Sequence, residues 1–555
     1  MKFKRITTLF LLFLSFSILL TSCKKEDKIK IKSEKTEFVN YSVDYNMTSK
    51  SLYTYFIDDS ETRYVDAAGF IRNLKGFYMT QYFRVSSTMF SDKLSIFVNV
   101  LMPDNSIKKV SAIFDWNNDT ISISDPVFFN LINISQTTNY SRLLQESQGE
   151  SVEVSPIVFK LSDFGFDIYF KNNKVLVPFS IMNTIFCSGA YYNIYYDGSK
   201  YFGVTYDISY YKDMQELKTC SLNNKEQTLE LRQETYNHLK FVMYYYYGLK
   251  EYKGITDIEE DLKDYKEGIL SLDPVVNKNT YYDYFVKHLD ELHTRIGAHS
   301  FYYDPTDNNT NNWNLDVTSN ARIQYKAVED ELKTISSGYF DGSNTYMVDG
   351  DTCMITLASF TTGSDEEVES DEAYKYDTFE FIKYVLDGLN SNVRNVIIDV
   401  AQNGGGNVGA LIRCLGFLSN DSVNYYSYNY LFNSATNVLM NIDVDKDDDY
   451  EDNDAYTQYN WYVLSSYNTF SAANSFTAMA KSLGATTIGQ KTGGGMCSVL
   501  PIVLADQATI EMSSNEAQMA WINGRYEFIE GGVEPDIYVD YDKFYDLNYI
   551  KSILV

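Results

Sequence analysis

The sequence predicts an α/β domain in its last third, preceded by a helical segment and a β-rich N-terminal domain. Three changes of pattern along the 555 residues indicate this order. Short apolar runs alternate with turn residues over 41–225, helical periodicity follows over 226–345, and strands alternate with helices over 346–555. Such alternation is typical of a sheet covered by helices, so we expect 346–555 to be the catalytic or binding α/β domain.

The elements expected in each region follow from the spacing of apolar residues. In the middle region this spacing predicts helices over 228–251, 258–270, 280–293 and 321–335. In the last region it predicts strands at 396–400 and 461–464 and helices over 376–389, 411–418 and 471–483. Gly484 is placed to end the last of these helices.

Charge and cysteine content exclude two classes of protein. The chain has 47 basic and 75 acidic side chains and a net charge of −28, which argues against nucleic acid as a partner. Six cysteines over 555 residues do not make a disulfide scaffold. A disulfide between Cys187 and Cys220 stays open for a chain outside the cytoplasm.

The N-terminus has the pattern of a bacterial lipoprotein signal. Basic residues within 1–5 precede an apolar run over 8–20, which ends in a Leu-Thr-Ser-Cys sequence resembling a lipobox. A plain secretory signal with an incidental cysteine is the alternative. We predict a signal peptide over 1–22, lipidation at Cys23 and a tether over 23–40. The chain would then sit in the bacterial cell envelope, held on a membrane by lipid and facing the periplasm or the cell surface.

An acidic run at 443–454 interrupts the α/β pattern. Carboxylates at alternate positions are typical of a calcium loop, but Asp448 stands where an EF-hand loop has Gly and Asp454 where it has Glu. The run therefore favours a solvated surface loop, and no metal site is predicted.

Two turns could carry chemistry. Ser471 lies between a predicted strand and a predicted helix, where the helix N-terminus favours a developing oxyanion; a simple Ser N-cap is the commoner explanation. Gly404, Gly405 and Gly406 follow a buried strand and can turn their N–H groups toward a ligand. A phosphate-binding loop is one alternative, but the Gly-Lys-Ser/Thr sequence that ends such loops is missing here. The other alternative is a glycine turn without function, which is also common.

Five stretches of the chain match a set of peptidase motifs in the same order. They are 289–294 (motif L-x-D-x-H-T), 399–406 (motif D-L-R-x-N-x-G-G), 470–474 (motif S-A-x-E), 488–495 (motif G-x-x-T-x-G) and 532–537 (motif G-V-x-P-D-I). Together they resemble the serine peptidase family that holds the C-terminal processing (tail-specific) peptidases and the tricorn core protease. The resemblance covers about 230–555 and implies a ClpP/crotonase-like catalytic domain.

The resemblance implies a role for each matching residue. Ser471 aligns with the nucleophile, and the N–H groups of Gly405 and Ala472 would form the oxyanion hole with Gly406 close by. The processing peptidases use a Lys base, but Gly495 stands at that position here. The tricorn-like arrangement therefore fits better, with His293 as general base and Glu530 orienting or charging the site.

Several residues compete for the base and acid roles. His299 is the alternative base, and Lys491 lies four residues before the usual Lys position. Glu527 and Glu534 are the alternatives to Glu530.

The chain also departs from the motifs. Ala401 replaces the motif Arg, Asn474 replaces the motif Glu, and Leu292 replaces the serine before the tricorn histidine. The segment from His299 to Tyr346 is too short for a PDZ domain.

The expected function is that of a lipid-anchored extracytoplasmic serine endopeptidase acting on peptide or protein substrates. The resemblance implies neither a metal nor an organic cofactor. One alternative is an inactive peptidase scaffold that binds peptides, because the motif Arg and Glu are missing. The other is a glycan-binding lipoprotein, suggested by tyrosine runs such as 244–247 and 191–192.

Overall fold

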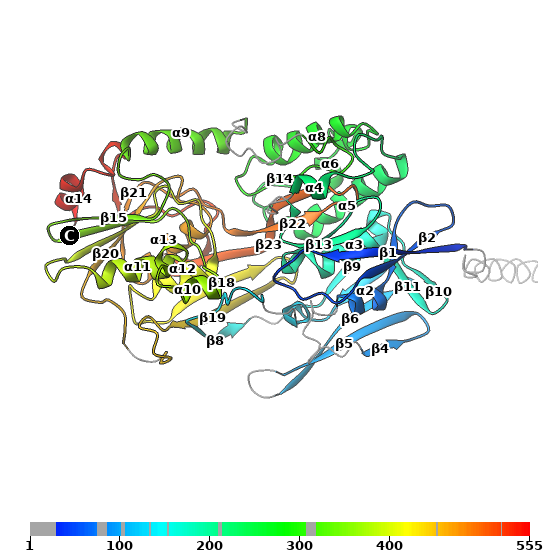
Figure 1. Cartoon of the computed structure of the whole chain (residues 1–555), viewed down its shortest axis with the longest axis horizontal. Coiled ribbons are helices and arrows are strands. Elements are labelled where there is room, and N and C mark those ends of the chain that lie inside the picture. Colours follow the sequence, from blue (N-terminus) through cyan, green and yellow to red (C-terminus); the bar gives the residue numbers. More distant parts are fainter. Residues whose placement is uncertain are drawn as a thin grey trace, which may run out of the picture.

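The computed structural model describes residues 29–74, 86–101, 106–131, 135–151, 155–208, 214–306, 318–450, 453–522 and 524–554. In this part of the chain, four sheets and their helices form an elongated molecule (Figure 1). The predicted signal peptide and Cys23 lie outside the described residues. Among the described helices, none combines the length and the apolar character that a membrane span requires.

Two sheets build the N-terminal half. The first runs in the order β10-β11-β3-β2-β1-β13-β12, and the second in the order β4-β5-β6-β7-β9. Helix α3 (Phe179–Phe186) is buried along its whole length and belongs to the core that both sheets share. The strands of the first sheet are β1 (Ile31–Asn40), β2 (Ser51–Ile57), β3 (Tyr64–Asp66), β10 (Tyr169–Lys171), β11 (Lys174–Pro178), β12 (Tyr192–Tyr196) and β13 (Tyr201–Thr205). Those of the second are β4 (Ser86–Met89), β5 (Lys93–Leu101), β6 (Ile107–Asp115), β7 (Thr120–Ile123) and β9 (Ile157–Lys160), and α2 (Ala67–Asn73) lies between β3 and β4 in the chain.

The middle region is helical, with boundaries that differ from the expected ones. Two short helices replace the helix expected over 258–270. The helix expected over 280–293 begins earlier, at Pro274, because Asp273 caps it by accepting a hydrogen bond from Val275. It continues as a π-helical turn that ends at His288, and Asp290 then takes a left-handed φ of 43°. His293 therefore lies in a bend that follows the helix rather than at the helix end itself. The helices are α5 (Leu229–Tyr246), α6 (Ile258–Asp261), α7 (Lys266–Ile269), α8 (Pro274–Tyr282), η6 (Asp283–His288) and α9 (Asn320–Ile335).

A six-stranded sheet forms the centre of the last region. Its order is β15-β16-β17-β20-β21-β25; β15 runs antiparallel to β16, and the remaining neighbours are parallel. Helices α11, α12 and α13 bury their apolar faces with one side of the sheet in a common core. The expected mixed α/β fold is thus confirmed. The elements are β15 (Thr345–Asp349), β16 (Thr352–Thr356), β17 (Asn395–Asp399), β20 (Asn460–Ser465), β21 (Thr486–Gly489), β25 (Ile537–Tyr538), α11 (Thr378–Asp387), α12 (Val408–Leu415) and α13 (Ala472–Ser482).

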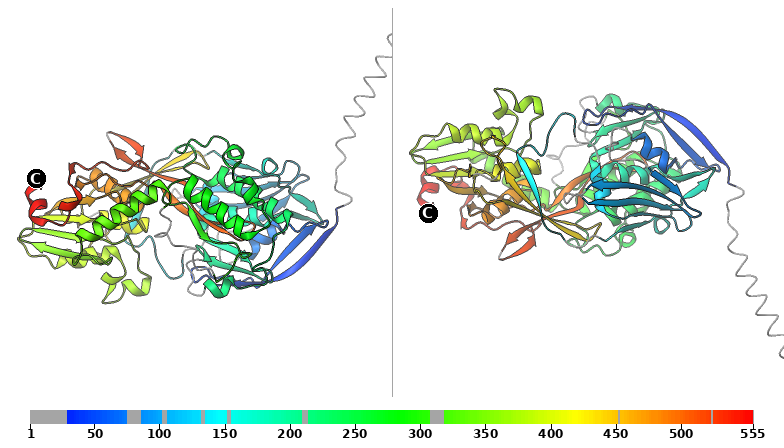
Figure 2. Two further views of the ribbon diagram at one scale, coloured as in Figure 1. Left: turned by 90° about the horizontal axis from the view of Figure 1, so that it is seen from above. Right: turned by 90° about the horizontal axis from the view of Figure 1, so that it is seen from below.

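A further seven-stranded sheet connects the two halves of the molecule. It runs β14-β23-β18-β19-β8, with β22 and β24 also paired to β23. The long strand β23 extends from one half to the other (Figures 1 and 2). Strand β8 comes from 41–225 and β14 from 226–345, so all three predicted regions share this sheet. Its strands are β8 (Leu144–Ser151), β14 (Arg295–Ala298), β18 (Val423–Asn429), β19 (Ser434–Ile442), β22 (Cys497–Val503), β23 (Thr509–Ile522) and β24 (Arg525–Phe528).

Three further α-helices are α4 (Met214–Lys218), α10 (Asp365–Val368) and α14 (Leu547–Ile553).

The five cysteines in the described part of the chain are free thiols. Cys187 and Cys220 are among them, so no disulfide joins these two residues.

Candidate active site

Ser471 occupies a strained turn between β20 and α13. Its φ of 56° and ψ of −123° cost a residue with a side chain about 1–3 kcal/mol. The turn is held by its N–H, which donates to the Gly494 carbonyl oxygen at 2.8 Å. Although Ser471 stands at the N-cap position of α13, its side chain makes no capping hydrogen bond. The simple N-cap interpretation is therefore wrong, and the hydroxyl is available for other chemistry.

The glycine turn after β17 lies against the Ser471 turn. The main chain of Asn403 joins them, because its carbonyl oxygen accepts from the Phe470 N–H at 3.2 Å. The Asn403 side chain acts within the glycine turn, where its Oδ1 accepts from the Gly405 N–H at 2.9 Å. The Gly405 N–H is thus engaged within the turn. Across the ranges that the structure describes, the N–H groups of Gly406 and Ala472 donate no hydrogen bond. These two amides can receive an oxyanion.

Gly405 is so close to Ser471 that a side chain does not fit. A Cβ atom there would lie 2.9 Å from the Ser471 Cβ, and the φ of 121° is open only to glycine. We expect Gly405→Ala to lower the free energy of unfolding by at least about 2 kcal/mol, measured by urea denaturation. Gly388→Ala is the matched control, because its φ is −89° and its Cβ would meet ordinary contacts at 3.5 Å. Equal losses in both variants would contradict this description of the turn.

His293 reaches the nucleophile turn from the bend before β14. Its ring packs on the Phe470 ring with 4.6 Å between centroids. Burial lowers the pKa of His293 to about 4, against an opposing effect of Glu291, so the imidazole is neutral near pH 7. Within the described chain, no hydrogen bond joins this ring to the Ser471 hydroxyl. Catalytic hydrogen bonds are often long before substrate binds.

Glu291 is a site residue that our sequence analysis missed. Its carboxylate accepts hydrogen bonds from the main-chain N–H groups of His293 at 2.6 Å and Thr294 at 2.9 Å, and from the Ser513 hydroxyl at 3.1 Å. It thereby fixes the segment that carries His293 against β23. Glu291 stands where the L-x-D-x-H-T motif has Asp, and that position was the available signal.

The alternative bases have partners of their own. Lys491 forms an ion pair with Glu534 at 2.9 Å, and both side chains are about half exposed. His299 follows β14 and packs on Tyr303. His293, in contrast, packs on Phe470, the residue before Ser471. The choice of His293 over Lys491 and His299 as base stays a prediction.

Glu530 lies in the loop that packs on the segment next to the nucleophile turn. Its Oε2 accepts from the Met496 N–H at 2.8 Å, and it makes no hydrogen bond to His293 or Ser471 among the described residues. Burial raises the pKa of Glu530 to about 7, and the nearby Glu291 adds to this effect. Its competitors lie at the surface: Glu527 pairs with Arg525, and Glu534 pairs with Lys491.

The position of the usual Lys base is filled by an aromatic ring. A Cβ atom on Gly495 would lie 3.0 Å from the Ser471 N and 2.6 Å from the Phe470 ring, and its φ is 87°. The Phe470 ring therefore occupies the space that a side chain from residue 495 would need. The His293 ring packs on this same Phe470 ring. One aromatic side chain therefore both fills the space of a residue-495 side chain and contacts His293.

The raised pKa of Glu530 predicts how the stability of the fold depends on pH. Between its ordinary pKa of 4.5 and about 7, the folded protein holds a proton that the unfolded chain releases, so stability falls as pH rises through this window. Glu530→Gln removes the cost of charging this group. We expect the variant to gain about 1–2 kcal/mol over the parent at pH 8 and almost nothing at pH 5.

Thermal unfolding at both pH values measures this difference. Glu527→Gln, which changes an exposed ion pair, is the matched control. A gain in Glu530→Gln that is the same at pH 5 and pH 8 would show that the carboxyl is not protonated in the folded state.

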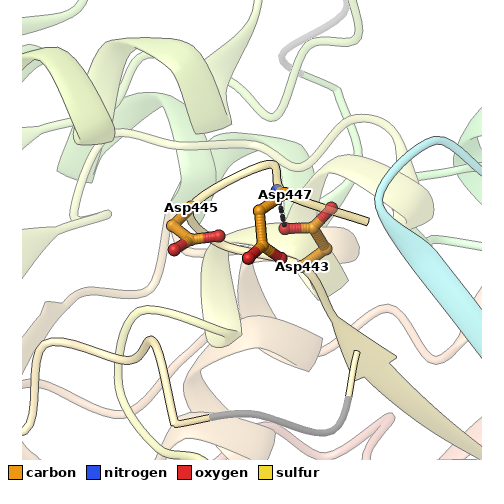
Figure 3. Close-up of side chains that lie close together, drawn as sticks. All are labelled: Asp443, Asp445 and Asp447. Carbon is orange, nitrogen blue, oxygen red and sulfur yellow. Dashed lines mark hydrogen bonds between the residues drawn. The ribbon is translucent and has the colours of Figure 1, made fainter. Parts of the chain in front are cut away.

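The described part of the acidic run, residues 443–450, 453 and 454, lies between β19 and β20. Carboxylate oxygens of Asp443, Asp445 and Asp447 lie within 4.8 Å of one another (Figure 3). Asp443 is buried, and its oxygens accept main-chain N–H groups of Lys446, Asp447 and Asp448 at 2.6–3.1 Å. These contacts explain why Asp443 is needed to form the loop. The prediction that no metal binds here stays a prediction.

One segment of the chain matches a model of a known protein family. The family model of peptidase family S41 matches residues 351–539. No curated protein matches the sequence. Among solved structures, a suggested peptidase from Parabacteroides merdae is 16% identical with a TM-score of 0.40, covering 56% of this chain and 89% of that one. A lipoprotein from Streptococcus agalactiae is 14% identical with a TM-score of 0.37, covering 58% and 97%. The tricorn protease is 12% identical with a TM-score of 0.32, covering 84% and 46%.

Proposed function

We propose that this chain, whose residues 351–539 match the model of peptidase family S41, is a serine endopeptidase that cleaves peptide or protein substrates. Ser471 is the nucleophile of this proposal. The observation that carries it is the strained turn of Ser471, whose hydroxyl caps nothing although the residue stands at a helix N-cap. Strain of this kind concentrates at functional sites, and it holds a nucleophile in a fixed direction.

The residues around Ser471 supply the other parts of an acyl-transfer site. The hydroxyl attacks the peptide carbonyl, and His293 accepts its proton and later gives it to the leaving amine. The unengaged N–H groups of Gly406 and Ala472 bind the oxyanion, while Gly405 keeps the two turns in contact. The acyl-enzyme is then hydrolysed by water. Glu291 orients His293, and Glu530 adds negative charge near the site once it is deprotonated.

The cellular location belongs to the same proposal. A lipid on Cys23 would hold the peptidase on a membrane in the bacterial cell envelope, on its periplasmic or cell-surface side. The catalytic domain would take the ClpP/crotonase-like arrangement. The net charge of −28 favours substrates that are neutral or basic through long-range attraction.

A peptide-binding protein without turnover is the second candidate. It is favoured by one observation, the missing hydrogen bond between His293 and Ser471 within the described chain. The tyrosine runs that suggested a glycan-binding protein are mixed in exposure. Tyr192, Tyr246 and Tyr247 are buried, whereas Tyr191 and Tyr244 are exposed, so this alternative stays a prediction.

Peptide cleavage separates the two candidates. We would incubate the protein from residue 24 onward with an unfolded protein and with a peptide library, and identify products by mass spectrometry. New peptide ends that appear with the parent chain and not with Ser471→Ala support the endopeptidase. Peptides retained equally by both proteins, without new ends, support the binding protein and contradict the peptidase.

A further inference from the structure

A buried hydrogen-bond chain links the nucleophile helix to the loop that carries Glu530. Asn474, in the first turn of α13, donates from Nδ2 to the Ile529 carbonyl oxygen at 3.1 Å. Its Oδ1 accepts from the Thr492 hydroxyl at 2.6 Å. The Thr492 oxygen in turn accepts from the Val533 N–H at 2.6 Å. The side chains of all four residues are buried, so each bond is shielded from water.

The hydrogen bonds hold the main chain on both sides of Glu530 in the sequence. Ile529 immediately precedes it, and Val533 follows three residues later, with its main-chain oxygen also accepting from the Thr492 N–H at 3.1 Å. The Glu530 carboxylate meets the Met496 N–H, close to Gly494, whose carbonyl oxygen holds the Ser471 N–H. The loop and the nucleophile turn are therefore fixed to the same short segment.

Asn474 explains one departure from the family motif. An amide accepts one hydrogen bond and donates another, and this site uses both. A carboxylate has no proton to give to the Ile529 carbonyl oxygen, so the motif Glu could not make the same pair of bonds. The replacement of the motif Glu by Asn474, which suggested an inactive scaffold, therefore suits the hydrogen bonds that this loop requires.

We propose that Asn474 and Thr492 are positioning residues that hold Glu530 at a fixed place beside Ser471. The inference rests on the proposed function, since Glu530 matters only if Ser471 reacts. A shift of about 1 Å in a catalytic group can cost 10²-fold in rate. Releasing the loop would also admit water to Glu530 and bring its pKa down toward the ordinary range. The titratable groups that interact with the Glu530 carboxyl through their charges are Glu291, Lys253, Cys497, Tyr247, Tyr430 and Tyr467.

Thr492→Val tests the proposal, because it keeps the shape and removes the hydroxyl. Thr492→Ser restores the hydroxyl, and Asn474→Asp removes the amide donor. Thr477→Val is the control on the same helix, since that buried hydroxyl donates within α13, to the Ala473 carbonyl oxygen. Two readouts are taken: hydrogen–deuterium exchange of the segment 528–534, and the rate of fluorophosphonate labelling of Ser471 between pH 5 and pH 9.

We expect faster exchange in 528–534, labelling reduced about 10- to 100-fold, and a pH midpoint moved to lower pH in Thr492→Val and Asn474→Asp. Thr492→Ser and Thr477→Val should resemble the parent. Unchanged exchange in Thr492→Val would overturn the anchoring. Faster exchange with unchanged labelling would overturn the positioning role. A parent chain that is never labelled would instead contradict the proposed function, and exchange alone would then decide whether the loop is anchored.

Discussion

Replacing Ser471 with alanine is expected to lower peptide hydrolysis by about 10⁴–10⁶-fold and to abolish fluorophosphonate labelling. The physical reason is the loss of the hydroxyl that forms the acyl-enzyme. The fold should survive, because that hydroxyl makes no capping hydrogen bond in the turn. The kcat of the variant on a peptide substrate measures the loss, and circular dichroism checks the fold.

The strain at the same position gives an internal control. Ser471→Gly also removes the hydroxyl but accepts the φ of 56° without penalty. We expect it to unfold at a higher urea concentration than Ser471→Ala, with about 1 kcal/mol more stability. If Ser471→Ala kept most of its hydrolysis, Ser471 would not be the nucleophile, whatever the strain in its turn.

Replacing His293 with alanine is expected to have the next largest effect, a fall in labelling and hydrolysis of about 10⁴-fold or more. His293 is the histidine whose ring packs against the nucleophile turn, through Phe470. Its low pKa, about 4, leaves the imidazole ready to accept a proton at neutral pH. Added imidazole should restore part of the rate by entering the space that the side chain leaves.

His299→Ala is the matched comparison for this prediction. That residue is also a buried histidine, but it lies beyond β14 and packs on Tyr303. We expect it to change stability without removing labelling. A loss of labelling in His299→Ala, with His293→Ala active, would transfer the base role to His299.

Local patterns in the sequence predicted the parts of the fold that depend on neighbouring residues. The strands at 396–400 and 461–464 and the helix after Ser471 were found because their apolar spacing is set within a few residues. The antiparallel sheet around β23 was not found, because it pairs strands separated by hundreds of residues. No local sequence pattern predicts that β8 and β14 belong to the same sheet.

The same distinction holds for the candidate site. Ser471, His293 and the glycine turn were singled out because they lie in motifs with a fixed spacing. The engagement of the Gly405 N–H by Asn403 was not predictable, since it depends on how one side chain folds back within its own turn. The role of Phe470 was not predictable either, because it depends on the contacts of its ring with Gly495 and His293, which are far apart in the sequence.

The central claim is that Ser471 is an activated nucleophile, and covalent labelling tests it most directly. The protein from residue 24 onward is treated with a fluorophosphonate, its intact mass is recorded, and the adduct is mapped by peptide sequencing. We predict a single adduct on Ser471 that is absent from Ser471→Ala and strongly reduced in His293→Ala. A folded parent chain that carries no adduct between pH 5 and pH 9, or an adduct on another serine, would contradict the account.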